Sequence, residues 1–233
     1  MKFVSIPAGT FAISADLRRA VNLTDYPERR VTITKPFYLG VYEVTQAQWA
    51  AVMGNNPSRF KGDLNPVEMV SWDDAASFVA KLNQTLQEGS YRLPTEAEFE
   101  RALFAGATAA NFWGDKPEDV TRYAWYWENA DGETHPVGKK EPNPWGLFDV
   151  LGNVDEWVSG WDAENYYAEG PRDDPPGAAS GRERISRGCS WGDSGCGSFY
   201  RETTYPDERN DNFGLRLVFE PDNRKTKRLR LQR

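Results

Sequence analysis

The chain has 233 residues, and 35 acidic residues against 28 basic ones give it a formal net charge of -7. This length suits one sizeable domain, and no internal linker is marked by a change in composition. The chain holds 9 Trp, 10 Tyr and 12 Phe, large side chains that disordered proteins lack, so we expect a folded globule. A single histidine excludes sites that need two imidazoles, and two cysteines cannot form a disulfide framework.

The charge is unevenly distributed. Residues 222–233 hold six Lys or Arg and one Asp, a net charge of +5, so the remaining body carries -12. The acidic body is expected to repel nucleic acid, whereas the basic tail either contacts an acidic partner or is simply solvated. No apolar run approaches the roughly 20 residues that cross a membrane, and residues 1–7 enter a strand-like pattern too early for a secretion signal. We therefore expect no membrane partner and a cytoplasmic location, unless a leader has been removed.

The first half of the chain predicts strands followed by helices. Residues 3–11, 31–34 and 37–44 alternate or run apolar with aromatics, which is typical of strands. Three helical patterns then begin after Thr45, Ser71 and Thr95, whose side-chain oxygens are suited to N-capping, each with a residue three positions on that can complete a capping box. Gly54 and Gly106 are expected to end the first and third helices.

The second half is less regular. Further strands are expected at residues 137–138, 157–159, 184–188 and 215–219, but residues 106–184 otherwise carry little periodicity. These elements predict an α+β domain with a few short helices on small antiparallel sheets and much irregular structure. Irregular backbone inside a compact body must satisfy its polar groups with side chains, water or ions, so a bound metal would have a structural reason there.

Residues 189–212 have the composition of a recognition surface. Between Gly192 and Tyr205 there is no lysine, and glycine, serine, tyrosine and threonine are frequent. Aromatic rings give rigid contact area while small polar side chains adapt their hydrogen bonds. The residues expected to contact a ligand are Trp191, Asp193, Ser194, Cys196, Ser198, Phe199, Tyr200, Glu202, Tyr205, Asn210 and Asn212. The alternative places Trp191 and Phe199 in the core, with only the polar residues facing outward.

Ordered sequence blocks carry a family resemblance. They include IPAGTF at 6–11, YEVTQ at 42–46, NPSRF at 56–60, YRLPTEAE at 91–98, NPWGL at 143–147, GNV at 152–154 and RG at 187–188. On these blocks the chain resembles the formylglycine-generating enzyme (sulfatase-modifying factor) family from about residue 3 to 218. The resemblance implies a C-type-lectin-like fold of the formylglycine-generating enzyme type, with residues 1–221 as the domain and 222–233 as a basic tail.

The cysteines depart from the pattern of the active members of that family. Those enzymes carry two cysteines in a C-x-x-x-x-C arrangement that bind copper(I) and drive oxidation of a substrate cysteine to formylglycine, and soft thiolates suit Cu(I). Here Cys189 and Cys196 are separated by six residues, and Cys189 stands where the family has the second glycine of Arg-Gly-Gly-Ser-Trp. This spacing is expected to disturb a two-thiolate site. The two cysteines can also be small core residues or a reversible disulfide.

The final third also resembles the variable proteins of diversity-generating retroelements, which share the fold and display a ligand-binding surface near the C-terminus. In those systems randomised adenines turn asparagine-type codons into Ser, Gly, Asp, Tyr, Cys, Phe, Thr and similar residues, but not into Lys, Gln, Met or Trp. From residue 189 to 205 only Trp191 and Glu202 lie outside the reachable set. We therefore expect a noncatalytic binding protein that contacts a protein or other macromolecule. The alternatives are a copper oxidase using Cys196 and Cys189, or a structural accessory domain of a larger complex.

Residues 149–157 bring hard oxygen donors together, as calcium requires. By the family resemblance, the expected calcium ligands are Asn153, the Val154 carbonyl and Glu156, with Asn129 in a second site. The alternative is a hydrogen-bonded loop without an ion.

Overall fold

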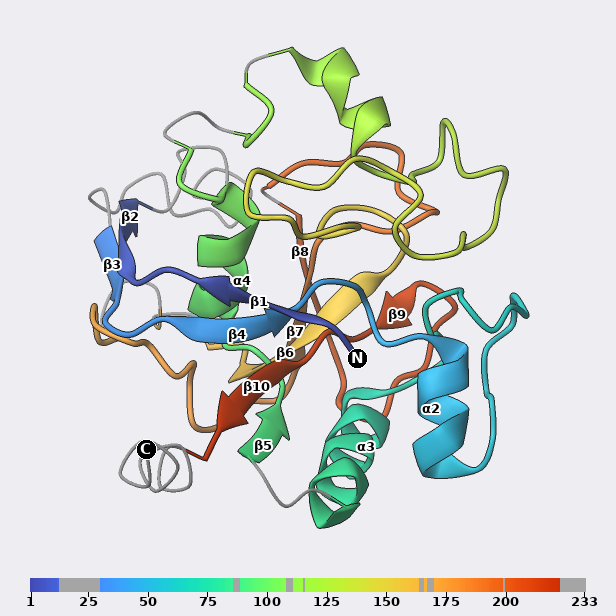
Figure 1. Ribbon diagram of the computed structural model, residues 1–233, viewed down its shortest axis with the longest axis horizontal. Coiled ribbons are helices and arrows are strands. Elements are labelled where there is room, and N and C mark those ends of the chain that lie inside the picture. Colours follow the sequence, from blue (N-terminus) through green and yellow to red (C-terminus); the bar gives the residue numbers. More distant parts are fainter. Residues whose placement is uncertain are drawn as a thin grey trace, which may run out of the picture.

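The computed structural model describes residues 1–12, 30–85, 89–107, 111–114, 116–163, 166, 170–198 and 200–222. Short helices and small sheets are joined by long irregular segments (Figure 1). The helices are α2 (Gln46–Met53), α3 (Trp72–Thr85), α4 (Glu96–Phe104) and the 3-10 helix η1 (Pro117–Arg122). The strands are β1 (Phe3–Ile6), β2 (Gly9–Ala12), β3 (Arg30–Ile33), β4 (Phe37–Gly40), β5 (Gly89–Arg92), β6 (Asp155–Trp161), β7 (Arg184–Arg187), β8 (Arg201–Thr204), β9 (Phe213–Gly214) and β10 (Val218–Pro221).

Three sheets organise the described chain. One has the strand order β1-β4-β10-β5, the second pairs β2 with β3, and the third has the order β8-β7-β6-β9. All pairs are antiparallel except β6 with β9, which run parallel. Because β1 and β10 both pair with β4, the two ends of the described chain are held in one sheet. The prediction of an α+β fold with small, mainly antiparallel sheets is confirmed.

The helix starts follow the sequence prediction. Thr45 and Gln48 exchange side-chain and backbone hydrogen bonds at 3.3 Å each, and Thr95 does the same with Glu98. Gly54, at φ 82°, caps the end of α2 as predicted. The end of α4 differs by one residue, since Ala105 is the left-handed C-cap and Gly106 follows it in the same region.

Two hydrophobic clusters form the core. The first is centred on α4, whose residues are all buried, and packs Phe99 and Leu103 with Leu39. The second lies beneath α2 and α3, where the rings of Trp49 and Phe78 stack with centroids 4.9 Å apart. The sheet β8-β7-β6-β9 lies between these clusters, so both faces of its central strand β6 are covered.

Several predicted strands differ in the structure. The strand expected over residues 3–11 is two strands, β1 and β2, in different sheets. Residues 137–138 form a turn, because Gly138 has φ 75° and its amide donates to Asp149. Strands β5, β8 and β9 were not predicted, and the strand expected over residues 215–219 begins only at Val218, as β10. Residues 106–184 are largely irregular, as expected: η1 and β6 are the named elements that lie wholly within their described part, and β7 begins at Arg184.

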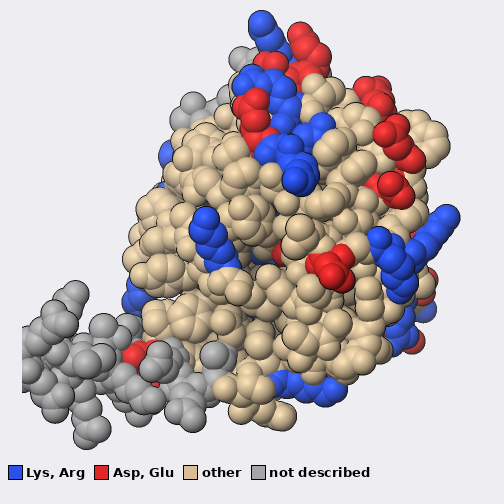
Figure 2. All heavy atoms as spheres, turned by 45° about the vertical axis from the view of Figure 1, so that its right-hand side comes forward, with Lys and Arg blue, Asp and Glu red and all other residues tan. Residues whose placement is uncertain are grey.

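Figure 2 shows one face of the molecule. Lysine, arginine, aspartate and glutamate side chains are interspersed toward its margins, while uncharged residues cover most of its middle. Near the top of this face, a group of basic side chains is flanked by acidic ones. The tail from residue 223 onward lies outside the described residues.

Candidate functional site

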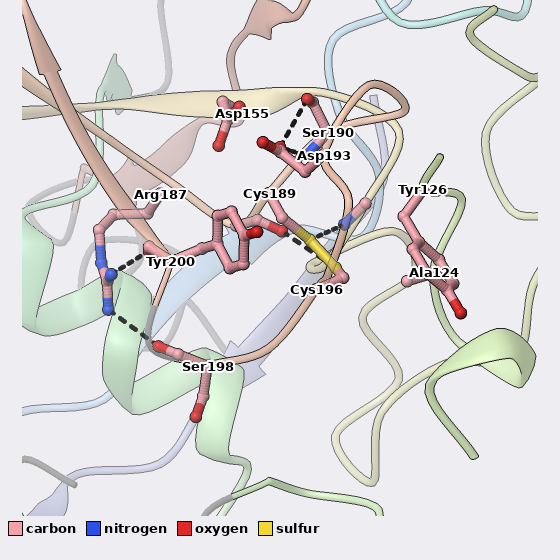
Figure 3. Close-up of a disulfide and its surroundings, with 12 residues drawn as sticks. Ala124, Tyr126, Asp155, Arg187, Cys189, Ser190, Asp193, Cys196, Ser198 and Tyr200 are labelled. Carbon is pink, nitrogen blue, oxygen red and sulfur yellow. Dashed lines mark hydrogen bonds between the residues drawn. A yellow bond between two sulfur atoms is a disulfide. The ribbon is translucent and has the colours of Figure 1, made fainter. Parts of the chain in front are cut away.

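A disulfide joins Cys189 to Cys196 at the end of β7 (Figure 3). The two Cα atoms are 5.6 Å apart, and the bridge closes a short loop over residues 189–196. Cys189 is fully buried with a left-handed φ of 59°, and its sulfur accepts a hydrogen bond from the Gly152 amide at 3.2 Å. Of the states that the sequence left open for these cysteines, the structure shows the disulfide.

The disulfide corrects one step of the sequence argument. The six-residue spacing was expected to disturb a site that uses both sulfur atoms, yet the fold brings the two sulfurs into direct contact. Spacing alone therefore does not separate this chain from a two-cysteine copper site. In the bonded state neither sulfur is a thiolate, which is the form that binds copper(I).

The loop is anchored by polar and aromatic contacts. The Asp193 carboxylate accepts from both the amide and the hydroxyl of Ser190, each at 2.7 Å. The Trp191 indole donates to the Asp211 carbonyl at 2.9 Å and meets Phe60 edge to face with centroids 5.1 Å apart. Trp191 is thus half-buried and positioned by the 56–60 block, between the two alternatives considered for it.

Asp155 lies beside this loop at the start of β6. This residue is 1% exposed. The side-chain amide of Asn212 donates to Asp155 Oδ2 at 3.3 Å, while Asp155 Oδ1 has no hydrogen-bond partner among the described residues. Burial raises the pKa of Asp155 well above its ordinary value, and the carboxylates of Asp193 and Glu202 raise it further. Hydrogen bonds to the Asp155 carboxylate from the Ser190 side chain and the Cys189 backbone oppose this rise. Burial, then Asp193, also raises the pKa of Glu202.

The predicted ligand residues occupy different environments. Trp191, Asp193, Cys196, Tyr200, Glu202 and Asn212 are half-buried, whereas Ser194, Tyr205 and Asn210 are exposed. Ser198 is 2% exposed and so does not reach the surface, and Phe199 lies outside the described residues. The half-buried residues gather around the disulfide and Asp155. Tyr205 lies apart, with the Arg182 guanidinium 5.3 Å from its ring centre.

Sequence reasoning missed several residues that complete this surface. Trp127 is 64% exposed and its amide donates to the Asp193 carbonyl at 3.1 Å. Arg59 pairs with Asp211, next to the anchored Trp191. Asp155 lies in the 149–157 stretch that was singled out from the sequence for its oxygen donors, but it was not among the expected ligand residues. The available signal was its place two residues before Trp157, which puts both side chains on one face once the strand predicted at 157–159 is extended to Asp155.

The predicted calcium ligands have protein partners. Asn153 Oδ1 accepts from the His135 amide, both Glu156 oxygens accept from Arg216, and Asn129 bonds Tyr126 and Ala124. Each of these three side chains therefore takes part in protein hydrogen bonds, and calcium binding through them and the Val154 carbonyl stays a prediction. Among the described residues, no three His, Cys, Asp or Glu side chains are grouped to hold a metal ion.

A charged network lies in the interior beside those residues. Arg216 is fully buried and bonds Glu156 at 2.8 Å and the Gly40 and Phe148 carbonyls. Burial raises the pKa of Glu43 well above its ordinary value, and it raises the pKa of Asp149 to about 6. Asp149 Oδ1 is buried without a hydrogen-bond partner in the described chain.

Comparison with known proteins identifies the family. Residues 1–221 match the sulfatase-modifying factor enzyme 1-like domain. The chain belongs to this family. Among its relatives, chaperone protein LppX of Paenibacillus barcinonensis is 32% identical over 217 residues, which cover 72% of this chain and 73% of LppX. The formylglycine-generating enzyme of Streptomyces coelicolor is 35% identical over 175 residues, but these cover only 54% of that enzyme and 68% of this chain.

A solved structure extends the likeness over nearly the whole domain. Treponema denticola variable protein 1 is 30% identical and superposes with a TM-score of 0.84 across 94% of this chain and 95% of its own. The predicted C-type-lectin-like fold of the formylglycine-generating enzyme type is thereby confirmed. Within the family, the chain resembles both an enzyme and a protein named for its variability.

Proposed function

We propose that this protein is a noncatalytic, ligand-binding member of the sulfatase-modifying factor family, and that residues 189–212 contact a protein or other macromolecular ligand. The observation that carries the proposal is the close structural likeness to variable protein 1 over almost the whole chain. The half-buried aromatic and polar residues around the disulfide support it, because such mixtures bind at low entropy cost.

We further propose that the chain is a variable protein of a diversity-generating retroelement. The two residues of 189–205 that diversification cannot reach have defined places, since Trp191 is anchored on Phe60 and Asp211, and Glu202 lies in β8. Exposed neighbours such as Gly192 and Ser194 belong to the reachable set. A neighbouring reverse transcriptase gene and an adenine-rich near-copy of the 189–212 coding sequence are expected in the genome. Their absence would remove the retroelement from the proposal while leaving ligand binding in place.

A copper-dependent oxidase acting on a substrate cysteine is the second candidate. Its support is the relationship to the Streptomyces enzyme and the contact of the two sulfur atoms, which reduction would turn into adjacent thiols. The third candidate, an accessory domain that docks through residues 222–233, rests on the charge of that tail, which lies almost wholly outside the described residues.

The enzyme assay separates the first two candidates. The reduced protein is titrated with copper(I) and incubated in air with a cysteine-containing peptide, and mass spectrometry follows formylglycine. We expect no product, and no difference between the wild type and Cys196→Ser. Stoichiometric copper binding that Cys196→Ser abolishes, together with turnover, would replace the binding proposal by the oxidase.

A further inference from the structure

Three carboxylates from separate segments meet on one face of the sheet β8-β7-β6-β9. Ser186 in β7 pairs with Trp157 in β6 and with Glu202 in β8, so these three side chains share a face. Asp155 lies two residues before Trp157 and shares it too. Asp193 reaches the same place from the disulfide loop, and Figure 3 shows its carboxylate close to that of Asp155 on one side of the disulfide.

The buried polar atoms at this place lack partners. Asp155 Oδ1, Ser186 Oγ and Asn212 Oδ1 are all buried, and none has a hydrogen-bond partner among the described residues. Two of them belong to side chains that are only 1% exposed, Asp155 and Ser186. A buried polar atom without a partner costs about 1–3 kcal/mol. Asp155 Oδ1 and Asn212 Oδ1 each lack a donor, and the Ser186 hydroxyl can both donate and accept, so a group that brings donors would satisfy all three.

The electrostatics of the place call for a cation. Within the described chain, no ion pair involves Asp155, Asp193 or Glu202. The three carboxylates act on one another and on the nearby Tyr200 hydroxyl, and burial together with their charge raises the pKa of that tyrosine. A positive group entering between them would favour the charged forms of Asp155 and Glu202, whose pKa values burial raises, in a site that is partly shielded from water.

The geometry favours an organic cation over a metal ion. The carboxylates are not grouped closely enough to count as a metal site in the described residues. A guanidinium group is larger, carries five N–H donors in a plane and is weakly hydrated, so it can reach separated acceptors. Trp127, whose backbone amide donates to the Asp193 carbonyl, is 64% exposed, so its ring is available to pack on the apolar stem of an arginine.

We propose that Asp155, Asp193 and Glu202 form a pocket for the guanidinium group of an arginine side chain presented by the protein ligand. The proposal rests on the binding function proposed above and names the chemistry that the 189–212 surface recognises. Neither Asp155, outside the segment, nor Glu202, outside the reachable codons, would vary under retroelement diversification. Arginine recognition would then be a constant part of a surface whose other contacts vary.

A pair of small probes tests the pocket in the full-length protein. Nα-acetyl-argininamide is compared with Nα-acetyl-citrullinamide, which has nearly the same shape and no charge, and binding is followed by amide chemical shifts in an NMR titration. We expect the arginine probe to bind at the 189–212 surface and the citrulline probe to bind at least about tenfold more weakly. Glu202→Gln and Asp193→Asn should each weaken the arginine probe by about tenfold.

The controls keep every outcome interpretable. Asp207→Asn removes an exposed carboxylate from the same segment and should leave probe affinity unchanged. Asp155→Asn should also weaken binding, and its thermal transition shows whether it folds; if it does not, Glu202→Gln and Asp193→Asn decide. Equal binding of both probes, no binding, or an arginine affinity that these variants leave unchanged would overturn the pocket. So would calcium chloride producing the same shifts at Glu202 and Asp193, because the occupant would then be a metal ion.

The probe titration and the formylglycine assay test different claims, so the pocket and the binding role can fail independently. If the arginine probe fails while no formylglycine is produced, the pocket is wrong and the binding role stands. If formylglycine is produced, the binding role falls whatever the probes show.

Discussion

At the residue scale, Arg184 lies between two tryptophan rings. Its guanidinium carbon is 3.4 Å from the ring centre of Trp72 and 3.5 Å from that of Trp161, and its Nη1 donates to the Ser159 carbonyl at 3.0 Å. Burial lowers the pKa of Arg184 to about 10, so it remains protonated at neutral pH. Since Trp72 begins α3, this stack connects that helix to the sheet that carries the candidate site.

Replacing Arg184 tests how much this stack stabilises the fold. We expect Arg184→Ala to lower the free energy of unfolding by about 2–3 kcal/mol, because a desolvated cation–π contact with two rings and a buried hydrogen bond are lost. Arg184→Lys should recover only part of this loss, since an ammonium group cannot stack in the slot as a planar guanidinium does. Urea denaturation measures both.

The control is Arg122→Ala, which removes an exposed ion pair with Glu141 and should leave the transition nearly unchanged. A lysine variant as stable as the wild type would show that charge alone, rather than stacking, holds Arg184 in place.

At the element scale, α4 and its ion pairs position the strands of the site. Arg187 in β7 donates to Glu100 at 3.0 Å, and Arg201 in β8 donates to Glu96 at 2.9 Å. Arg187 also donates to the Tyr200 and Ser198 carbonyls, so one buried guanidinium ties the helix to the far end of the disulfide loop. The loop is thus held from its interior side, and the disulfide closes its other end.

Reducing the disulfide should loosen the loop without unfolding the domain. A bridge between residues seven apart is expected to stabilise the fold by about 2–3 kcal/mol through loop closure. We expect urea denaturation to show a free energy of unfolding that is lower by that amount in the Cys189→Ser/Cys196→Ser variant. Faster amide exchange should be confined to residues 189–198, while α4 keeps its protection.

Amide exchange that accelerates equally throughout α4 would contradict this prediction, because it would show that the disulfide stabilises the whole core.

The disulfide also bears on the cellular compartment, since structural disulfides are typical of secreted proteins and rare in the cytosol. Alkylation of free thiols in cell extracts would show which state the protein adopts and would test the expected cytoplasmic location.

At this scale, the sequence could predict the features that neighbouring residues determine. The capping boxes at Thr45 and Thr95 are local, and they were predicted correctly. Strand β8 was missed because all four of its residues are half-buried and polar or charged, and its pairing comes from β7. The segment proposed to contact a ligand was singled out by composition, whereas Asp155 and Trp127 join it only through tertiary packing.

At the scale of the whole molecule, the two halves of the chain meet in a buried charged network. Glu43, Asp149, Glu156 and Arg216 come from four separate parts of the sequence, and three carboxylates there face a single guanidinium. Lys140 contributes a further, more distant positive charge that lowers the pKa of Asp149. Acidic groups therefore outnumber basic groups in this network. Asp149 Oδ1, which has no hydrogen-bond partner in the described chain, is the oxygen best placed to bind a cation.

Calcium is the cation that the family resemblance predicts, and it can be tested through stability. If an ion binds the folded chain alone, calcium at 100 times its dissociation constant should add about 2.7 kcal/mol to the free energy of unfolding. For a domain of this size the melting temperature should rise by roughly 5–10 °C between EDTA and calcium, as measured by scanning calorimetry. Asp149→Asn should abolish most of this rise. In EDTA its melting temperature should be close to that of the wild type, because the side-chain oxygen of the asparagine can still accept from the Gly138 backbone amide. Asp207→Asn, at the surface, should respond to calcium as the wild type does. Identical transitions in EDTA and calcium would show that the network is stable as a hydrogen-bonded interior without an ion.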